Sequence, residues 1–279
     1  MLDIFNIPGQ QDNVKIFYAS DTNAWQTWTR PRNCKFVWIM CIGGGMGGQG
    51  GAGTTPTQAG SGGPSGALTR ALFPANVLPD ILYVQTGAGS NGGGGAAGQT
   101  TNNAPGNPGR SFVSLTPSSA VVMNLVCTSG LAAGVGSTLT AETAATVAAA
   151  GLLSLGNFIS VAGTATTSLS TTIVTGGANG LTSTSAAGNN VTGISTPGLE
   201  IPTSAGGTGG TGGDGGNGFQ SFKPLCSIGG ASGGGNTGGN GGRGGNGGIG
   251  SGGGAGGPGS ATGGTGGKGG DGLVIIATF

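Results

Sequence analysis

Side chains able to do acid–base chemistry are few and scattered in this 279-residue chain, and histidine is absent. General acid–base catalysis uses His or tuned carboxylates that are held together. Asp214 and Asp271 each follow a glycine pair, and we expect them to be solvated or to cap backbone amides. The eight acidic residues, separated along the chain, are Asp3, Asp12, Asp21, Asp80, Glu142, Glu200, Asp214 and Asp271. We therefore expect no catalytic residues and no enzyme.

The four cysteines have no metal-site spacing. Cys34, Cys41, Cys127 and Cys226 form no CxxC pair, and the lack of His excludes the common mixed Cys/His zinc sites. Cys34 and Cys41 are seven residues apart in one expected strand and are expected on opposite faces of it. The sequence predicts buried free thiols and no bound metal.

Nucleotide- and calcium-binding motifs are not supported either. Matches to Gly-x-Gly-x-x-Gly carry almost no information in a chain with 70 glycines. Lys268 is followed by Gly269, where a P-loop needs Ser or Thr, and the GGxGxD calcium repeat occurs only in fragments. We expect no cofactor.

The charge balance excludes partners that bind through basic patches. Lys and Arg number 9, Asp and Glu 8, and the net charge is +1, so no basic face is expected for nucleic acid or anionic lipid. A surface so poor in charge is typical of a protein locked in an assembly or facing an extracellular medium. Residues 1–13 lack the basic and apolar regions of a signal peptide, which predicts synthesis in a cytoplasm and release by other means.

The chain is organised around the glycine repeat from Gly206 to Phe279. Two residues in three are glycine over most of it, a period that fits neither an α-helix face nor a strand face. Three residues per turn is the period of the extended helix of polyproline and collagen. Glycine on two of the three edges would let neighbouring helices touch, while the third edge carries one side chain per turn. The sequence predicts packed polyglycine-II-like helices.

A flexible glycine linker is the alternative interpretation of this repeat. Order is favoured because the repeat ends in an apolar strand, Leu273–Phe279. The positions of the non-glycine residues also shift by one at 258–261, a turn signal. We therefore expect two glycine helices, 240–258 and 262–271, joined by that turn.

Apolar segments predict a framework of short strands. Lys35–Ile42 is nearly all apolar, as expected for a strand buried on both faces, and it runs directly into a glycine tract. Its best partner is Leu273–Phe279, because each adjoins a glycine tract. Further strands are expected at Val14–Tyr18, Trp25–Thr29, Ile81–Thr86, Gly109–Leu115 and Val121–Cys127.

Residues 128–204 differ in kind, being rich in Ala, Thr and Ser. Short strands at Phe158–Val161 and Leu169–Val174 and a helix over Ala141–Ala150 are expected there. A membrane span over 144–162 is disfavoured by its polar residues and its lack of basic flanks. The fold class is mainly β: a sandwich-like strand framework combined with polyglycine-II-like helices. The expected division is an N-terminal part (1–127), an inserted subdomain (128–205) and the glycine-repeat part (206–279).

Several of these features resemble the glycine-rich domain of phage virion proteins, notably tail-fibre proteins and adhesins. The resemblance covers roughly 25–115 and 206–279 and is carried by short motifs. These are Trp28-Thr29-Arg30-Pro31, the strand Phe36–Ile42 followed by GGGMGGQGG, Gly87-Ala88-Gly89, Gly109-Arg110-Ser111-Phe112-Val113 and Gly269-Gly270-Asp271-Gly272-Leu273. The residues that it marks as structural are Trp28, Pro31, Gly43, Gly44, Gly45, Gly87, Gly89, Gly269, Gly270 and Gly272. It implies a strand framework enclosing packed glycine helices on a phage particle.

Two functions follow from the resemblance. The first is an adhesin at a tail tip or fibre, whose loops bind host polysaccharide or an outer-membrane protein; the expected loops are 54–66, 99–108, 178–200 and 219–228. The second is a structural virion protein, such as a capsid decoration or minor tail protein with a large apolar interface. Both imply other virion proteins as partners and a homo-oligomer, with a trimer favoured. A bacterial cell-surface glycine-rich protein is disfavoured by the missing signal peptide.

Overall fold

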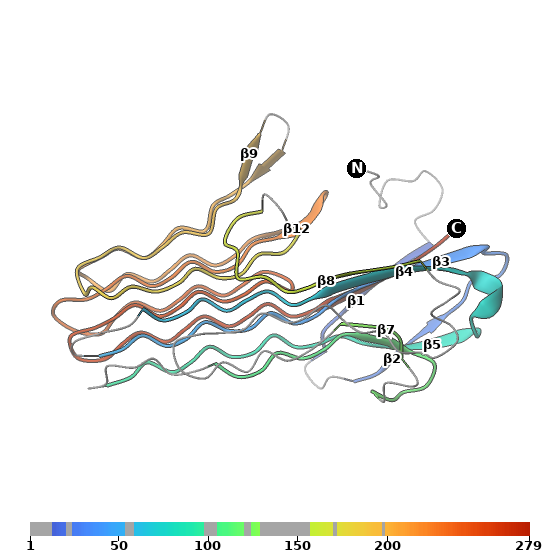
Figure 1. The fold of residues 1–279 in the computed structure, drawn as a ribbon, viewed down its shortest axis with the longest axis horizontal. Coiled ribbons are helices and arrows are strands. Elements are labelled where there is room, and N and C mark those ends of the chain that lie inside the picture. The colour runs from blue at the N-terminus through green and yellow to red at the C-terminus, as the bar shows by residue number, and fades with distance from the viewer. Residues whose placement is uncertain are drawn as a thin grey trace.

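Two antiparallel sheets form one end of the molecule in the computed structural model (Figure 1). The structure describes residues 13–20, 24–53, 59–97, 105–119, 124–128, 157–169, 172–196 and 199–279. The first sheet has five strands in the order β1-β13-β3-β4-β8. Their bounds are Val14–Tyr18 for β1, Leu273–Thr278 for β13, Phe36–Ile42 for β3, Leu68–Pro74 for β4 and Asn157–Val161 for β8.

The second sheet has four strands in the order β2-β5-β6-β7. They are β2 (Gln26–Thr29), β5 (Ile81–Gln85), β6 (Phe112–Ser114) and β7 (Asn124–Cys127). Two separate hairpins pair β9 (Ile194–Thr196) with β10 (Leu199–Ile201) and β11 (Gln220–Phe222) with β12 (Leu225–Ser227). Helix is limited, in the described part of the chain, to short 3₁₀ turns such as η2 (Ala75–Val77). The expected mainly β fold is therefore confirmed.

A hydrophobic core lies between the two sheets. Alternate residues of the first sheet, such as Ile39 and Ile276, are buried against residues of the second sheet, such as Leu82 and Val113. Successive side chains of a strand point to opposite faces, so the remaining residues of β3 and β13 face away from this core. Leu273, Ile275 and Met40 on that other face belong to a second cluster.

Most of the expected strands are present. The expected pairing of β3 with β13 is confirmed, with Leu273 opposite Ile42 and Thr278 opposite Val37. Strand β4 was not expected, although it is a central strand of the first sheet. The expected strand Leu169–Val174 is wrong for its described residues, where Val174 forms only an isolated bridge to Ser227. The expected helix at 141–150 lies outside the described residues.

The Ala-, Thr- and Ser-rich region contributes to the main sheet. Strand β8 pairs antiparallel with β4, with Leu68 opposite Val161 and Leu72 opposite Asn157. This part of 128–205 therefore shares a sheet with the N-terminal strands. The three-part division of the chain stays a prediction. No helix within the described residues is long and apolar enough to cross a membrane.

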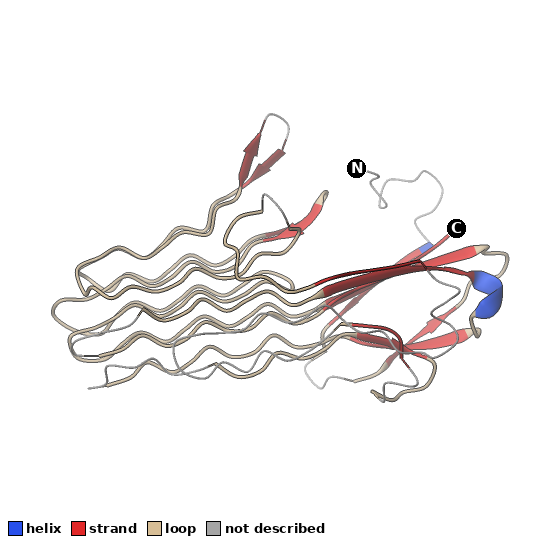
Figure 2. Ribbon diagram, in the orientation of Figure 1, coloured by secondary structure: helices blue, strands red, loops and turns tan. Residues whose placement is uncertain are grey.

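Glycine-rich segments continue the strands away from the two sheets (Figure 2). We call them glycine tracts. The eight that matter most below are 43–53, 59–66, 86–97, 174–182, 228–236, 240–249, 251–258 and 262–272.

The expected single run 240–258 is wrong, because the chain reverses at Gly250. Gly250 has a φ of 65°, the left-handed conformation that glycine adopts at little cost. The amide of Gly254 donates to the carbonyl of Gly245, and that of Gly257 to Gly242, so tracts 240–249 and 251–258 run antiparallel. The second expected reversal, at 258–261, is present: Gly264 and Gly267 donate back to Gly257 and Gly254.

Candidate functional surfaces

Tract 251–258 lies at the centre of the glycine tracts and is hydrogen-bonded on six sides. The amides of Gly254, Ala255 and Gly256 donate to three different tracts, at 2.8 to 3.0 Å. The carbonyls of Gly253, Gly254 and Ala255 accept from three others, at 2.8 to 2.9 Å. The donating contacts go to Gly245, Ala178 and Gln49, and the accepting contacts come from Gly63, Gly267 and Gly233. Successive residues of tract 251–258 thus form hydrogen bonds with different neighbouring tracts.

Hydrogen bonds between neighbouring tracts recur every third residue. The amides of residues 45, 48 and 51 donate to residues 270, 267 and 264 of tract 262–272. The carbonyls of the same three residues accept from residues 90, 93 and 96 of tract 86–97. The same three residues of tract 43–53 therefore donate hydrogen bonds to one neighbouring tract and accept hydrogen bonds from another.

Many positions of the tracts require glycine because the backbone of a neighbouring tract lies very close to them. A Cβ built on Gly254 would lie closer than 3.0 Å to the carbonyl of Ala231, and one on Gly48 equally close to that of Gly254. Real Cβ atoms essentially never show such a separation, and a backbone atom cannot move aside cheaply. Gly238, in contrast, has nothing within 4 Å of an added Cβ.

The glycines marked by the family resemblance meet where strands become tracts. Gly45 donates to Gly270 at 2.8 Å, Gly272 to Gly87 at 2.7 Å, and Gly269 to Ser90 at 2.9 Å. A Cβ on any of the following would approach a backbone carbonyl closer than 3.0 Å: Gly44, Gly45, Gly87, Gly89, Gly269, Gly270 and Gly272. Gly43 opens tract 43–53, and its amide donates to Ala67. Three segments of sequence, 43–45, 87–89 and 269–272, thus meet at one junction around the ends of β3, β5 and β13.

The other two marked residues lie at the sheets. Trp28 is buried in the core between them. Pro31 is partly exposed after β2, next to Arg30, whose guanidinium contacts Asp80 and the carbonyl of Ala75.

A ladder of polar side chains covers the exposed side of a further glycine-rich segment, residues 212–218, and of tracts 240–249 and 262–272. Asp214 accepts from the amide of Arg243 at 2.8 Å, and Asn217 from that of Asn246 at 2.9 Å. Asn246 in turn accepts from the amide of Lys268 at 2.9 Å. These amides face outward, and the side chain one tract away satisfies each of them. The expectation that Asp214 caps a backbone amide is confirmed.

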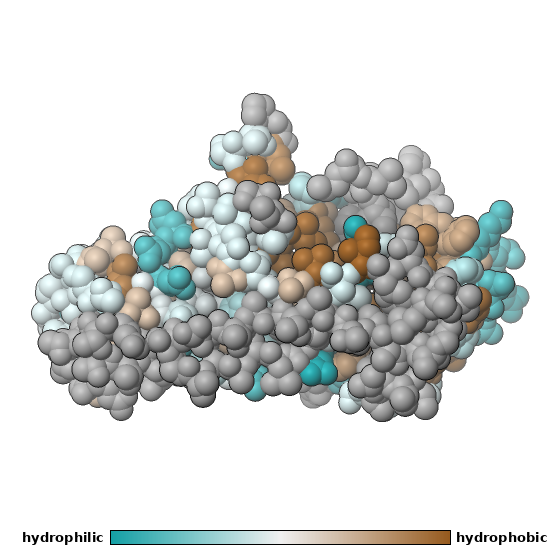
Figure 3. All heavy atoms as spheres, viewed as in Figure 1, coloured by the Kyte–Doolittle hydropathy of each residue, from teal (hydrophilic) through white to brown (hydrophobic). Residues whose placement is uncertain are grey.

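Turns between tracts gather at the end opposite the sheets. The backbone amide of Asn236 donates to the carbonyl of Pro258. In the same way the backbone amide of Thr237 donates to the carbonyl of Gly210, and that of Gly235 to the carbonyl of Ala186. Figure 3 shows that this end is mostly pale and teal, while brown hydrophobic residues gather beside the β11–β12 hairpin. The exposed residues of the described turns are small and polar, such as Ser183 and Ser260.

The expected binding loops are only partly brought together at that end. Residues 178–200 contain the turn around Ser183 but also strand β9, which projects from the side of the molecule (Figure 1). Loop 54–66 is described only from 59, and loop 99–108 only from 105. Loop 219–228 is different: it forms the β11–β12 hairpin over the second cluster, near Ile42.

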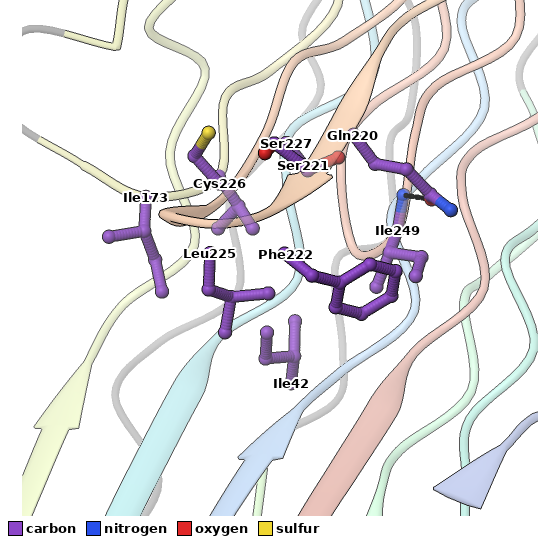
Figure 4. Close-up of a pocket in the computed structure, with 10 residues that line it drawn as sticks. Ile42, Ile173, Gln220, Ser221, Phe222, Leu225, Cys226, Ser227 and Ile249 are labelled. Atoms are coloured by element: carbon purple, nitrogen blue, oxygen red, sulfur yellow. Dashed lines mark hydrogen bonds between the residues drawn. The ribbon is translucent and has the colours of Figure 1, made fainter. Parts of the chain in front are cut away.

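The β11–β12 hairpin closes an apolar contact against the first sheet (Figure 4). Phe222 and Leu225 point toward Ile42 and Ile249, and the space left among them is about 10 Å³. That volume is about one water molecule, so the hairpin acts as a cover and leaves no ligand pocket. Sequence reasoning did not find this role, although the Phe222 and Leu225 pair on a short turn signals an apolar face.

All four cysteines are free thiols, as expected, but only Cys41 and Cys226 are buried, while Cys34 and Cys127 are partly exposed. Burial raises the pKa of Cys41 well above 9.0, and nearby Cys127 raises it further. Burial also raises the pKa of Cys127, which Arg110 partly offsets, and that of Cys226, which a hydrogen bond from the Ser221 backbone partly offsets. Cys34 and Cys41 both contact the core between the sheets, so the expected opposite placement is wrong.

No group of three metal-ligating side chains occurs in the described part of the chain. Asp271 pairs with Lys268 at 3.1 Å and accepts from the amide of Gly89 at 2.8 Å.

The sequence of most of the chain is matched by a known family. A family model described as a glycine-rich domain matches residues 20–278. The chain belongs to this glycine-rich domain family. Comparison with curated proteins found no significant match. The match covers every described strand except β1 and all of the glycine tracts, and it includes residues 128–205.

Proposed function

We propose that this glycine-rich domain protein is a non-enzymatic component of a phage virion and acts as a tail-fibre or tail-tip adhesin. The observation that carries the proposal is the gathering of turns at the end opposite the sheets. Rigid scaffolds that present loops at one end are a common design for binding proteins. Family membership supports the glycine-rich architecture, and the short motifs after β2, β3 and β5 support the resemblance to virion proteins.

The glycine tracts are, in this proposal, polyglycine II helices. A three-residue repeat of hydrogen bonds to different neighbours is what such helices make. Tract 251–258, with six hydrogen-bonded neighbours, would then be the central helix of the bundle. Its non-glycine residues are small, including Ser251, Ala255 and Pro258, because no side of it faces solvent.

The rigid bundle would fix the turns relative to one another. Asn236 links two turns, because its amide donates to Pro258 and its side chain to Asn240 and Thr211. A loop ordered before binding loses less conformational entropy when it binds. The partners would be host surface polysaccharide or an outer-membrane protein, for which small polar side chains offer hydrogen bonds.

The test is binding of purified, labelled protein to intact host cells, with whole phage as competitor. Thr237→Arg and Ser260→Arg place a bulky charge on exposed turn residues, and Ser195→Arg places the same charge on the β9–β10 hairpin. Saturable binding that the two turn variants lose, and that the hairpin variant keeps, supports an adhesin with its site at the turns. Equal binding by all three variants contradicts that location, and no saturable binding by the unmodified protein contradicts the adhesin.

The second candidate is a capsid decoration or minor tail protein. It is favoured by the exposed apolar residues of the first sheet, including Phe36 and Ile159. Such a protein would be recovered as a homo-oligomer, with a trimer favoured, and would attach to empty capsids or tails without binding cells. Both candidates place the protein on the virion, after synthesis in the host cytoplasm.

A further inference from the structure

One groove between two glycine tracts is filled by a third tract, and it shows what such a groove needs. The filled groove lies between tracts 43–53 and 262–272, and tract 86–97 occupies it. The occupying tract donates to carbonyls of the first wall at 2.8 to 3.1 Å and accepts from amides of the second wall at 2.9 to 3.0 Å. Residues 90, 93 and 96 make both kinds of contact. A glycine tract is therefore bound between a row of carbonyls and a row of amides.

A second groove offers the same groups, and we call it the outer groove. It lies between tracts 240–249 and 262–272, which are joined by hydrogen bonds of 2.8 to 2.9 Å. On its first wall three carbonyls of partly exposed residues accept no hydrogen bond within the described residues, namely those of Gly241, Gly244 and Gly247. On its second wall the amides of Thr265 and Asp271 have no acceptor in the described part of the chain.

The filled groove has glycine wherever a side chain of its first wall would meet the occupant. A Cβ on Gly47 would lie closer than 3.0 Å to the carbonyl oxygen of Asn91 in the occupying tract. Gly44 and Gly50 have the same close approach to that tract. Each of these glycines directly precedes a residue whose carbonyl accepts from the occupant. The position before each accepting carbonyl must therefore lack a Cβ.

Tract 240–249 follows this rule on the side where it has a neighbour. There the amides of Gly215 and Gly218 donate to the carbonyls of Arg243 and Asn246, at 2.8 and 2.6 Å. The residues before these two carbonyls are Gly242 and Gly245, and a Cβ on either would lie closer than 3.0 Å to a carbonyl oxygen of segment 212–218.

The outer groove departs from this rule at every turn of its first wall. The residues before its three accepting carbonyls are Asn240, Arg243 and Asn246, and all three are exposed. Their side chains also reach the opposite wall. Asn240 Oδ1 accepts from Thr262 Oγ1 at 2.6 Å, Arg243 Nε donates to Thr265 Oγ1 at 3.2 Å, and Asn246 Oδ1 accepts from the amide of Lys268 at 2.9 Å. Three side chains thus lie across the groove.

We propose that Asn240, Arg243 and Asn246 close the outer groove to a glycine-repeat segment of a second chain. Their Cβ atoms take the space that the backbone of such a segment needs, and their polar ends bond to the opposite wall. An open groove of this kind would act as an unpaired strand edge does, as a template for another chain. The closure keeps the glycine tracts of separate copies from joining. This role does not depend on the adhesin proposal.

The experiment compares two triple variants of the full chain, in which residues 240, 243 and 246 are all changed to Gly or all to Ala. Both variants lose the same polar groups, but only the glycine variant loses the Cβ atoms. The probe is a labelled peptide of about five Gly-Gly-Asn repeats, which has the three-residue period of an extended glycine helix. Fluorescence anisotropy measures its binding.

We expect the glycine variant to bind the peptide at least about tenfold more tightly than the alanine variant or the parent, because a Cβ in a packed contact is not tolerated. Hydrogen exchange locates the bound peptide. The amides of Thr265 and Asp271 should exchange more slowly when the glycine variant holds the peptide, because they gain acceptors.

Equal binding of the peptide by the two triple variants, or no binding by the glycine variant, overturns the proposal. Binding by the parent as tight as that of the glycine variant shows that the groove is not closed and overturns it too. Unchanged exchange at Thr265 and Asp271 places the peptide elsewhere, with the same consequence. If the triple glycine variant does not fold, Arg243→Gly and Arg243→Ala replace the two triple variants, with the same order of affinities required.

Discussion

The hydroxyl of Ser111 donates to the carbonyl oxygen of Ile42 at 2.6 Å and joins the two sheets where their strands become glycine tracts. The same hydroxyl accepts from the amide of Gly87 at 3.0 Å, and the Ser111 amide donates to Thr128 Oγ1 at 2.9 Å. Ser111 is fully buried. One side chain therefore satisfies backbone groups that follow β3 and β5, far apart in sequence.

Ser111→Ala should lower the free energy of unfolding. It leaves the buried Gly87 amide without its acceptor, at about 1–3 kcal/mol for a buried unsatisfied group, and it removes one of the donors to the Ile42 carbonyl. Urea unfolding measures the change. Ser195→Ala, on the exposed face of β9, is the control and should be neutral. Equal stability of the two variants would show that the junction does not depend on this hydroxyl.

Asp214→Ala should destabilise the protein slightly, by about 0.5–1 kcal/mol, because the amide of Arg243 loses its acceptor. Asp214→Asn keeps a side-chain oxygen at the same place and should retain most of the stability. Thermal melting of the three proteins tests this. If Asp214→Asn is as unstable as Asp214→Ala, the negative charge matters and the hydrogen bond to the amide does not.

Stability should fall above pH 9 through the thiols. Burial raises the pKa of Cys41 in the folded state above the value of 9.0 expected when unfolded. Between these two pKa values the unfolded state releases a proton that the folded state keeps, so unfolding becomes more favourable as pH rises. Below pH 9 the thiol is protonated in both states and has no effect. Urea unfolding from pH 8 to 10.5 should show a shallower decline for Cys41→Ala, and parallel declines would contradict the shift.

Gly244→Val and Gly267→Val should both lower the melting temperature strongly. A Cβ at either position would lie closer than 3.0 Å to a backbone carbonyl, that of Gly254 or Gly245. Substitution at Asn246 or Thr265, on the exposed edge of the same tracts, should matter much less, although Asn246 accepts a hydrogen bond from Lys268. Unchanged melting of both valine variants would refute close packing of the tracts.

Much of the strand framework could be predicted from the sequence, because β3 and β13 are apolar runs beside glycine repeats. β4 was missed because Arg70 and Pro74 interrupt its apolar pattern. Arg70 is tolerated there because its exposed side chain lies on the face of the sheet that points away from the core, and Pro74 because it ends the strand. The reversal at Gly250 was missed because any glycine in a repeat can adopt a positive φ, and only the hydrogen bonds show which one does.

The candidate surfaces were less predictable than the framework. The repeat predicts that every third residue faces outward, and Asn246 and Lys268 do so. It does not say which tract is central. Ala255 occupies the same kind of position and is buried, because other tracts surround 251–258 on every side. The order of tracts depends on contacts distant in sequence, which local periodicity does not encode.

The most direct test of the packed glycine tracts compares the melting temperatures of Gly254→Ala and Gly238→Ala. Both add one methyl group to a glycine of the repeat, but only at Gly254 does it meet backbone atoms. We expect Gly254→Ala to cost about 3 kcal/mol or more, and Gly238→Ala to be neutral or to gain about 0.4–1 kcal/mol from reduced freedom of the unfolded chain. Equal melting temperatures for the two variants would contradict a bundle in which glycine is required by close approach.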